Sequence, residues 1–404
     1  MSDFNTFALL DAIIERLALK GYKQPTPIQM ECIPTLIDGN DLLGIAQTGT
    51  GKTAAFSLPI INKFGRNKAN AQAQSTRSLI LTPTRELASQ IMQNIDDYAD
   101  GLGLKTKVVY GGVGRQNQVD AIAQGLDILV ATPGRLLDLI ATGDVNFNAL
   151  EVFVLDEADT MLDMGFFRDV QNIIATLPKK RQTLLFSATM PAEIEVLAQA
   201  ILKNPSKVHI AAQTVTIDLV NQSVYHLEKS NKVPSLFNIL ANPDYEKVLI
   251  FCKTKYGADI IVKALEEASI TAASLHSGKT QAVREAALQH FKEAKLRVLV
   301  ATDVAARGID VDNISLVINY NLPEDPRNYI HRIGRTARAG KNGMAISFVV
   351  ENDVRQLTII EENIGQVIPV VTEQPFHKAF SAAPKQTKKK KPTKKTHKKR
   401  TRKK

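Results

Sequence analysis

The stretch LLGIAQTGTGKT, residues 42–53, carries the clearest structural signal in this chain of 404 residues. Its first part is an apolar run typical of a buried strand, and a glycine-rich turn follows directly. Lys52 and Thr53 then open a segment with helical spacing. A strand, a tight turn and a helix in this order form half of a βαβ unit. The stretch therefore predicts an α/β fold built on a mostly parallel sheet.

Similar units recur along the chain in two series. Their apolar runs lack polar alternation, which suits parallel strands that helices cover on both faces, and segments long enough for crossover helices separate them. The runs are 42–46, 78–82, 107–110, 127–131, 152–155, 183–186 and 207–210, then 223–227, 247–251, 272–276, 297–301, 315–320 and 345–350. We predict a first domain at 1–210, a polar linker at 211–221 and a second domain at 222–371.

Charge and cysteine content limit the possible classes of protein. Of the chain's net charge of +10, thirteen positive charges lie in 385–404, which leaves −3 for residues 1–384. Only Cys32 and Cys252 occur, without a C-x-x-C spacing, so neither a disulfide scaffold nor a structural zinc site is indicated. No apolar stretch reaches the ~18 residues of a membrane span, and no secretory signal precedes the first domain. These features favour a cytoplasmic protein.

The turn at 46–53 is suited to phosphate. Glycines let backbone amides approach a triphosphate closely, Lys52 can reach its β- and γ-phosphates, and Thr53 can hold Mg²⁺. We expect the loop to be lined by Ala46, Gln47, Thr48, Gly49, Thr50 and Gly51. The alternative is an ordinary turn before a helix. General P-loops begin with glycine, so Ala46 requires a negative φ there.

An acidic cluster follows the apolar run at 152–155. We assign Asp156 to Mg²⁺ and Glu157 to the attacking water, because phosphoryl transfer needs both functions. Asp159 can accept hydrogen bonds from the small loop that holds Ser187 and Thr189. Without the glycine loop, the cluster would equally be a solvated acidic turn.

The second half contains HRIGRTARAG at 331–340. Arg332, Arg335 and Arg338 repeat at three-residue spacing, so one helical turn would align them. Arginines from a second domain can stabilise charge on a transferring phosphoryl group, which would make hydrolysis depend on domain closure. A solvated basic helix face remains the alternative.

Taken together, the ordered motifs resemble those of the DEAD-box RNA helicases of superfamily two, most closely the bacterial RhlE-like subgroup. The resemblance covers about residues 4–370. Its motifs are GYKQPTPIQ (21–29), AQTGTGKT (46–53), PTRELA (83–88), GG (111–112), TPGR (132–135), DEAD (156–159), SAT (187–189), LIFCKTK (249–255), ATDVAARGID (301–310) and HRIGRTARAG (331–340). The resemblance implies two RecA-like domains and a Q motif at 2–30.

The resemblance also implies a role for each matching position. Gln29 would read the adenine edge and Phe4 would stack on the base, with Tyr22, Gln24 and Thr26 lining the pocket; Asp310 would contact the ribose; Arg335 and Arg338 would act as arginine fingers; His331 would link the domains near Asp159; and Arg85, Gly112, Thr132, Arg135, Arg284, Thr302 and Asp303 would contact RNA.

The function implied is RNA-stimulated hydrolysis of ATP to ADP and phosphate, with ATP and Mg²⁺ bound, to unwind short duplexes or remodel ribonucleoproteins. RNA would be bound largely without sequence specificity, and ribosomal precursors or the RNA-decay machinery are candidate partners. A DNA helicase or translocase and a non-enzymatic RNA-binding scaffold are the alternatives.

The last segment, 372–404, is expected to be a lysine-rich disordered tail. It could tether RNA through counterion release, serve as a nuclear-import signal, or be only a solvated terminus.

Overall fold

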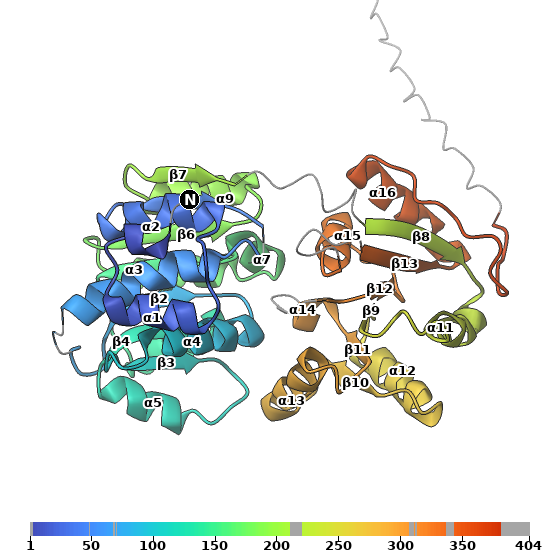
Figure 1. Ribbon diagram of the computed structural model, residues 1–404, viewed down its shortest axis with the longest axis horizontal. Helices are drawn as coiled ribbons and strands as arrows, with labels where there is room; N and C mark the ends of the chain where they lie inside the picture. The colour runs from blue at the N-terminus through green and yellow to red at the C-terminus, as the bar shows by residue number, and fades with distance from the viewer. Residues whose placement is uncertain are drawn as a thin grey trace, which may run out of the picture.

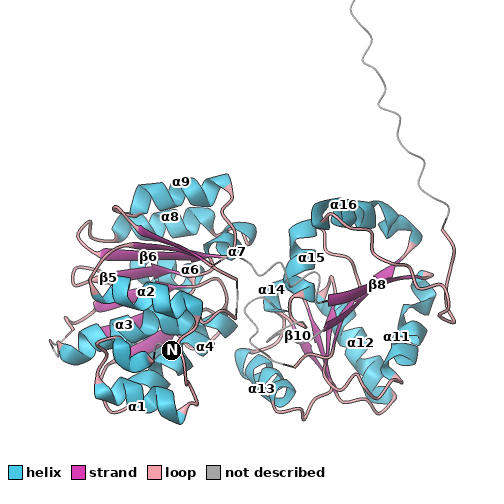
Figure 2. Cartoon of the chain, turned by 45° about the horizontal axis from the view of Figure 1, so that its top comes forward, coloured by secondary structure: helices cyan, strands magenta, loops and turns pink. Residues whose placement is uncertain are grey.

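The computed structural model describes residues 3–47, 49–67, 69, 71–210, 220–306, 311, 313–336 and 343–380. Two α/β domains follow one another, each a parallel sheet between layers of helices (Figures 1 and 2). This confirms the predicted fold class.

The first domain has a seven-stranded sheet in the order β3-β4-β2-β5-β6-β1-β7. Its strands are β1 (Leu42–Ile45), β2 (Thr76–Leu81), β3 (Thr106–Val109), β4 (Leu126–Ala131), β5 (Val152–Leu155), β6 (Gln182–Ser187) and β7 (Ser206–His209). Its helices are η1 (Phe4–Thr6), α1 (Asp11–Leu19), α2 (Pro27–Ile37), α3 (Lys52–Arg66), α4 (Arg85–Ala99), α5 (Gln116–Ala123), α6 (Pro133–Ala141), α7 (Ala158–Asp163), α8 (Phe167–Thr176) and α9 (Ala192–Ile201).

The second domain has a six-stranded sheet in the order β10-β11-β9-β12-β13-β8. Its strands are β8 (Val220–His226), β9 (Val248–Phe251), β10 (Ala272–Leu275), β11 (Val298–Ala301), β12 (Leu316–Asn319) and β13 (Gly343–Val349). Its helices are η2 (Lys229–Asn231), α11 (Lys232–Leu240), α12 (Lys255–Glu267), α13 (Gln281–Lys292), α14 (Asp303–Ala306), α15 (Pro326–Ile333), η3 (Glu351–Asp353) and α16 (Val354–Ile364).

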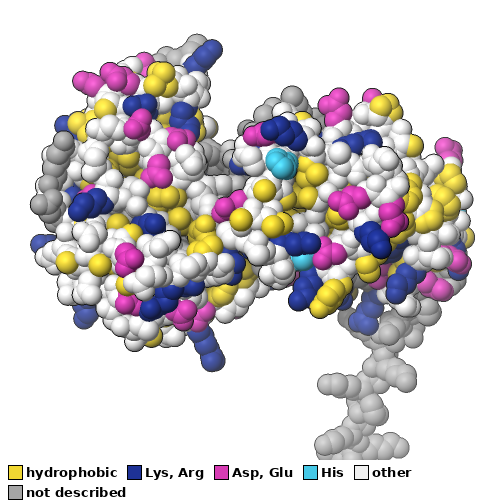
Figure 3. Space-filling model, turned by 90° about the horizontal axis from the view of Figure 1, so that it is seen from below, with side chains coloured by type: hydrophobic (Ala, Val, Ile, Leu, Met, Phe, Trp, Pro, Cys, Tyr) yellow, Lys and Arg dark blue, Asp and Glu magenta, His cyan; other side chains and the backbone are white. Residues whose placement is uncertain are grey.

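Apolar side chains cover both faces of each sheet, as continuous apolar strands require. On one face of the first sheet Phe56, Phe64 and Ile91 of α3 and α4 pack in one core. Leu136 of α6 and Ile173 of α8 pack in the core of the other face. Charged side chains of both signs are interspersed over the surface seen in Figure 3, which agrees with the near-neutral charge of residues 1–384.

Two predicted boundaries are wrong by a few residues. β8 begins at Val220, so the last two positions of the predicted linker belong to the second domain. Residues 372–380, predicted to begin the tail, pack along β8. There Gln374 Nε2 donates to His226 O at 3.3 Å, and Lys378 N–H donates to the same oxygen at 3.0 Å. Both shifts have one cause, because an edge strand recruits backbone partners that polar sequence does not reveal. Positions 211–219 and 381–404 lie outside the described residues.

The helices α13, α14 and α15 of the second domain face the first domain (Figure 1). Contacts between the domains include three polar pairs. Arg284 Nη2 lies 2.7 Å from Glu86 Oε1, Arg327 Nη2 lies 3.2 Å from Asp163 Oδ1, and Tyr110 Oη donates to Glu285 Oε1 at 3.3 Å. Within the described ranges, no helix combines the length and apolarity needed to cross a lipid bilayer.

Candidate functional site

The motifs gather at the carboxyl ends of the strands, where ligands bind in open parallel sheets. In the first sheet, β5, β6 and β1 are neighbours, and they lead into Asp156, Ser187 and the glycine loop. The other half of the sheet, β3, β4 and β2, leads into the motifs that contain Gly112, Thr132 and Arg85. One sheet edge therefore presents two adjacent sites.

The glycine loop between β1 and α3 has the backbone that its sequence requires. Gly49 and Gly51 have φ of +87° and +96°, a region that disfavours other residues. Ala46 is not among the residues with positive φ, so alanine fits there without strain. The Lys52 ammonium is buried and donates to Ala46 O at 3.0 Å. Thr50 Oγ1 donates to Gln47 O at 2.8 Å, Thr53 lies in the first turn of α3, and Thr48 lies outside the described residues.

The acidic cluster is buried directly after β5. Asp156 is 2% exposed and Glu157 6%. Burial raises the pKa of Asp156 to about 6, nearby Glu157 adds to the rise, and Lys52 opposes it. Glu157 has φ of +53°, a conformation that costs a non-glycine residue energy and that clusters at functional sites. A buried carboxylate beside a lysine and a helix N-terminus fits a bound cation and phosphate.

Asp159 is held by the loop after β6. Its carboxylate accepts from both the backbone N–H and the hydroxyl of Thr189, each at 2.8 Å. Its own N–H donates to the Ser187 hydroxyl at 3.2 Å, and that hydroxyl donates to Thr189 O at 2.7 Å. The predicted hydrogen bond between the SAT loop and Asp159 is therefore present. It connects the loop after β6 to the start of α7.

Two of the expected adenine-binding residues, Thr26 and Gln29, lie beside the glycine loop. Thr26 N–H donates to Gln29 Oε1 at 2.9 Å, and Gln29 Nε2 donates to Gly51 O at 3.2 Å. Gln29 thus joins the start of α2 to the phosphate loop. The Phe4 ring is buried and packs edge-on against Tyr22, whose hydroxyl lies 3.0 Å from that of Tyr98. Gln24 is exposed in the turn before α2.

The arginine motif differs from the predicted helical stripe. Helix α15 ends at Ile333, so Arg332 and Arg335 do not share one helical face. Both are buried, which excludes the solvated basic face as an account of them. Arg332 is fixed inside the second domain by Asp303, at 2.5 and 2.7 Å, and by Asn319 Oδ1 at 3.0 Å. Arg335 Nε donates to His331 O at 3.3 Å. The predicted Arg338 and Asp310 lie outside the described residues.

Helix α15 nevertheless meets the acidic cluster's helix. The Arg327–Asp163 ion pair joins α15 to α7, and α7 also contains Asp159. His331 and Arg335 lie on the same short element as Arg327 or just beyond it. The arginine motif of one domain and the acidic motif of the other therefore approach each other.

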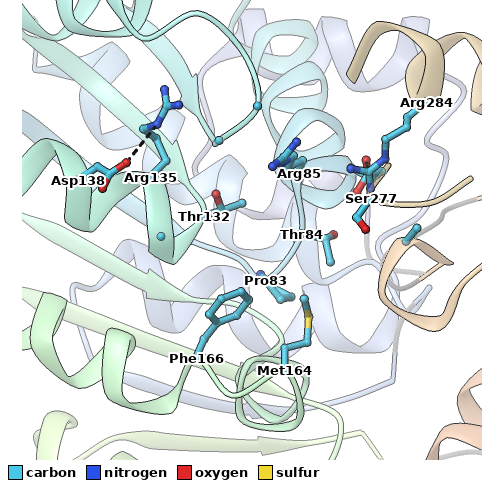
Figure 4. Close-up of a pocket in the computed structure, with 15 residues that line it drawn as sticks. Pro83, Thr84, Arg85, Thr132, Arg135, Asp138, Met164, Phe166, Ser277 and Arg284 are labelled. Carbon is cyan, nitrogen blue, oxygen red and sulfur yellow. Dashed lines mark ion pairs between the residues drawn. The ribbon is translucent and has the colours of Figure 1, made fainter. Parts of the chain in front are cut away.

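A second site is a cavity of about 600 Å³ between the domains, named here the interdomain groove (Figure 4). It contains five of the seven predicted RNA contacts. Its lining consists of Pro83, Thr84, Arg85, Glu86, Gly111, Gly112, Thr132, Gly134, Arg135, Asp138, Met164, Phe166, Ser277, Arg284 and Ala305. The other two predicted contacts, Thr302 and Asp303, are absent from that lining.

Arginine side chains give the groove its chemistry. Buried nitrogens with no hydrogen-bond partner within the described ranges include Arg135 Nη1 and Arg284 Nε. Arg135 Nε also lacks one, although it lies 4.0 Å from Asp138 Oδ2 in a long ion pair (Figure 4). Burial and the neighbouring Arg284 both lower the pKa of Arg85. Burial raises the pKa of Glu86, and the charge of Arg284 partly offsets this. Buried donors without acceptors in a concave site favour an anionic ligand.

Asp303 is better placed to hold Arg332 in position than to bind RNA directly. Both of its carboxylate oxygens accept from Arg332, and a carboxylate repels phosphate. Any RNA contact there would have to involve the sugar or the protein backbone. Thr302, the residue before it, donates its N–H to Leu275 O at 3.2 Å.

Sequence reasoning singled out none of the other ten groove residues. Six of them lie inside quoted motifs, and four lie outside them: Asp138, Met164, Phe166 and Ser277. Glu86 was concealed inside PTRELA, next to the predicted Arg85. Met164 and Phe166 flank Gly165 between α7 and α8, and two apolar residues outside a regular element were the available signal. Ser277 follows β10 at the same sheet edge as the motifs, and that position alone could have identified it.

Comparisons with known proteins agree with both halves of the chain. Residues 26–197 match the DEAD/DEAH box helicase family, and 228–340 match the helicase conserved C-terminal domain. A protein of Listeria monocytogenes named ATP-dependent RNA helicase CshA is 40% identical over 94% of this chain and 72% of its own. One of Buchnera aphidicola (from Schizaphis graminum) named ATP-dependent RNA helicase DeaD is 44% identical over 92% of this chain. The chain spans only 61% of that relative's length.

Among solved structures, Saccharomyces cerevisiae Dbp5 bound to RNA and ADP BeF3 superposes with a TM-score of 0.80 at 29% identity. The match covers 92% of this chain and 96% of that one. A variant of Dbp5 bound to Gle1 and IP6 gives 0.71, over 92% and 95%. The RhlE-like subgroup is not confirmed, since these bacterial relatives are named DeaD and CshA. From its ordered motifs, its paired parallel sheets and these matches, the chain belongs to the DEAD/DEAH box helicase family.

Proposed function

We propose that this protein is an ATP-dependent RNA helicase that hydrolyses ATP when RNA is bound and separates short duplexes or remodels ribonucleoproteins. The observation that carries the proposal is the joining of α15 to α7 through Arg327 and Asp163. It brings the arginine motif of the second domain to the acidic motif of the first. Hydrolysis that needs groups from both domains can be controlled by whatever ligand brings them together.

The residues of the first domain fit ATP with Mg²⁺. We assign the triphosphate to the loop 46–51 and Lys52, and the metal to Thr53 and Asp156. Bound Mg²⁺ would neutralise charge on the phosphates. The raised pKa of Asp156 supports this assignment, because a carboxylate that is costly to ionise alone gains most from a cation.

The remaining roles follow from position. Glu157, held in a strained backbone conformation, would orient the attacking water and accept its proton. Arg335, with Arg338 as the second finger, would stabilise charge on the phosphoryl group from the far side. Asp159, Ser187 and Thr189 would pass a change at the phosphates to α7, and His331 would receive it across the interface.

We propose that RNA occupies the interdomain groove. Arg85, Arg135 and Arg284 supply cationic donors, and Gly112 and Thr132 supply close backbone approach, so recognition would fall on the sugar-phosphate backbone with little base specificity. The better superposition on the RNA-bound form of Dbp5 than on its Gle1-bound form supports a domain arrangement suited to RNA.

The test is steady-state ATP hydrolysis by the purified chain with and without single-stranded RNA. We expect strong stimulation by RNA, and loss of that stimulation in Glu157→Gln. The matched control is Glu195→Gln, an exposed acidic residue in the first turn of α9 that does not line the groove. Hydrolysis that Glu157→Gln leaves intact would show that another group activates the water. A wild-type chain without RNA-stimulated hydrolysis would favour the non-enzymatic scaffold.

The runner-up function is a DNA helicase or translocase, since tandem domains of this kind also act on DNA. Single-stranded DNA of the same sequence decides between them. Equal or greater stimulation by DNA would support the alternative. Stimulation by RNA alone would support contacts that require the 2′-hydroxyl.

We infer that the basic residues 385–404 tether RNA electrostatically. Deleting 381–404 should therefore raise the KM for RNA, more at low salt, while turnover at saturating RNA is unchanged.

We further propose a cytoplasmic location, which fits two buried free cysteines, with ribosomal precursors or the decay machinery as targets. Crosslinking the protein to cellular RNA and sequencing the fragments would identify those targets.

A further inference from the structure

The second domain contributes to the interdomain groove through a tight turn after β10, residues 276–279. Lys279 N–H donates to His276 O at 3.1 Å, which closes a four-residue turn with Ser277 and Gly278 in the middle. Ser277 is exposed and lines the groove beside Arg284 (Figure 4). Its hydroxyl has no hydrogen-bond partner within the part of the chain that the structure describes.

The buried imidazole of His276 holds this turn through hydrogen bonds. His276 is 3% exposed, and its Nδ1 accepts the N–H of Gly278 at 3.1 Å. The other nitrogen, Nε2, lies 3.0 Å from Asp259 Oδ1. Because Nδ1 accepts a backbone proton, Nε2 must carry the ring proton and donate it to Asp259. These two bonds fix one neutral tautomer and one ring orientation.

Asp259 of α12 holds both ends of the turn. Its Oδ1 meets His276 at the first position and Lys279 Nζ, also at 3.0 Å, at the last. The Ser274 hydroxyl donates to the same oxygen at 2.6 Å. Burial by itself would raise the pKa of Asp259, but these three hydrogen bonds outweigh it and hold the pKa well below its usual range. The carboxylate is therefore ionised at neutral pH.

The fit between ring and turn is close. A Cβ added at Gly278 would lie 3.1 Å from His276 Nδ1 and 3.2 Å from Cε1, so the ring would have to move. Neither His276 nor Asp259 lines the groove, and neither belongs to the nucleotide site. Apart from the Ser274 bond to Asp259, the side-chain hydrogen bonds described for the pair join each other or the turn.

We propose that His276 is a positioning residue for RNA binding, which, with Asp259, holds the turn so that the Ser277 hydroxyl contacts the RNA backbone. The proposal rests on the proposed function, since it places RNA in the groove. The ligand group is a phosphate oxygen or a ribose hydroxyl, either of which a serine hydroxyl can bind. The proposed contact would be a second one from the second domain, beside Arg284 in the groove lining.

The geometry also predicts which substitution of His276 should keep the turn intact. In an Asx turn, the side-chain oxygen of asparagine accepts a hydrogen bond from the backbone N–H two residues further along the chain. His276 Nδ1 makes the same kind of bond. His276→Asn should therefore keep the bond to Gly278. His276→Gln could approach Asp259, but its longer side chain does not suit a bond to the N–H two residues on. His276→Leu removes both bonds.

The experiment measures RNA-stimulated ATP hydrolysis of the full chain across RNA concentrations, using a single-stranded homopolymer. Ser277→Ala should raise the KM for RNA about three-fold, the effect of one neutral hydrogen bond, with turnover at saturating RNA unchanged. His276→Leu and His276→Gln should raise it by at least as much, and His276→Asn should stay near wild type. His290→Leu, an exposed histidine of α13, is the matched control.

An unchanged KM for RNA in Ser277→Ala would overturn the proposal, and so would equal values for the asparagine and leucine variants of His276. Ser277 is exposed, so its variant decides the question even if His276→Leu fails to fold. A wild-type chain that RNA does not stimulate would instead refute the proposed function itself, before any variant is compared.

Discussion

At Gly112, both the backbone conformation and a neighbouring side chain disfavour a larger residue. Its φ is +84°, and an added Cβ would collide with the guanidinium of Arg85. Gly112→Ala should displace Arg85 and strain the backbone by ~1–2 kcal/mol, which we expect to raise the KM for RNA about ten-fold. The KM for ATP at saturating RNA should change little. Gly114→Ala, in the same loop with nothing within 4 Å, should behave as wild type in the same ATPase titration.

An unchanged KM for RNA in Gly112→Ala would mean that the RNA does not bind against Arg85. An equal defect in Gly114→Ala would show that the loop as a whole, and not this contact, matters.

The buried carboxylate of Asp156 destabilises the folded, unliganded protein when it is ionised. The folded chain raises its pKa from 3.8 to about 6, so the native state binds this proton more tightly than the unfolded state does. The unliganded protein should therefore lose stability from this group as pH rises from about 4 to about 6. Asp156→Asn should melt higher than wild type at pH 8, with the difference shrinking toward pH 5.

Thermal melts with and without Mg²⁺ and ATP check this prediction. Wild type should gain stability from the nucleotide, and Asp156→Asn should gain little. Asp244→Asn, an exposed substitution in the second domain, should match wild type throughout. A lower melting temperature for Asp156→Asn at pH 8 would show that the carboxylate's local bonds outweigh its burial.

At the scale of elements, the segment 366–380 behaves as part of the second domain. Val224, in the edge strand β8, donates its N–H to Pro369 O at 2.8 Å, and Ile368 is 1% exposed. Removing residues 366–404 should strip this edge and cost ~2–5 kcal/mol, the usual effect of losing a large buried side chain. Removing only 381–404 should leave the melting temperature unchanged.

Circular dichroism melts of the two truncations and the full chain make this test. Equal melting temperatures in all three would mean that the segment contributes nothing to the fold. A drop in the 1–380 chain would place structural contacts within 381–404.

The elements themselves were largely predictable. Strands appeared as apolar runs because both faces of a parallel sheet are buried, and the glycine loop specified its own turn. The end of α15 before Arg335 was not predictable from three-residue spacing, because spacing does not show where a helix stops. Nor was the partner of Arg332, since the pairing with Asp303 is made between segments far apart in sequence.

At the scale of the whole molecule, closure depends on contacts between the domains. Tyr110 donates to Glu285 at 3.3 Å, next to the buried Glu86–Arg284 pair. Tyr110→Phe and Glu285→Gln should each lower RNA-stimulated turnover about two-fold, and the double variant should be no worse than either single one. ATPase assays of wild type, the two single variants and the double variant form a double-mutant cycle that checks this prediction. Effects that multiply in the double variant would show that the two residues act independently.

The central claim is that ATP hydrolysis requires groups from both domains, brought together when RNA is bound. The most direct measurement is the ATPase rate of wild type and Arg335→Ala, each with and without saturating RNA, alongside nucleotide binding. We expect strong RNA stimulation in wild type, and a ~10³-fold loss of turnover in Arg335→Ala with ATP still bound. Hydrolysis at the same rate with and without RNA, or an Arg335→Ala variant as active as wild type, would contradict the account.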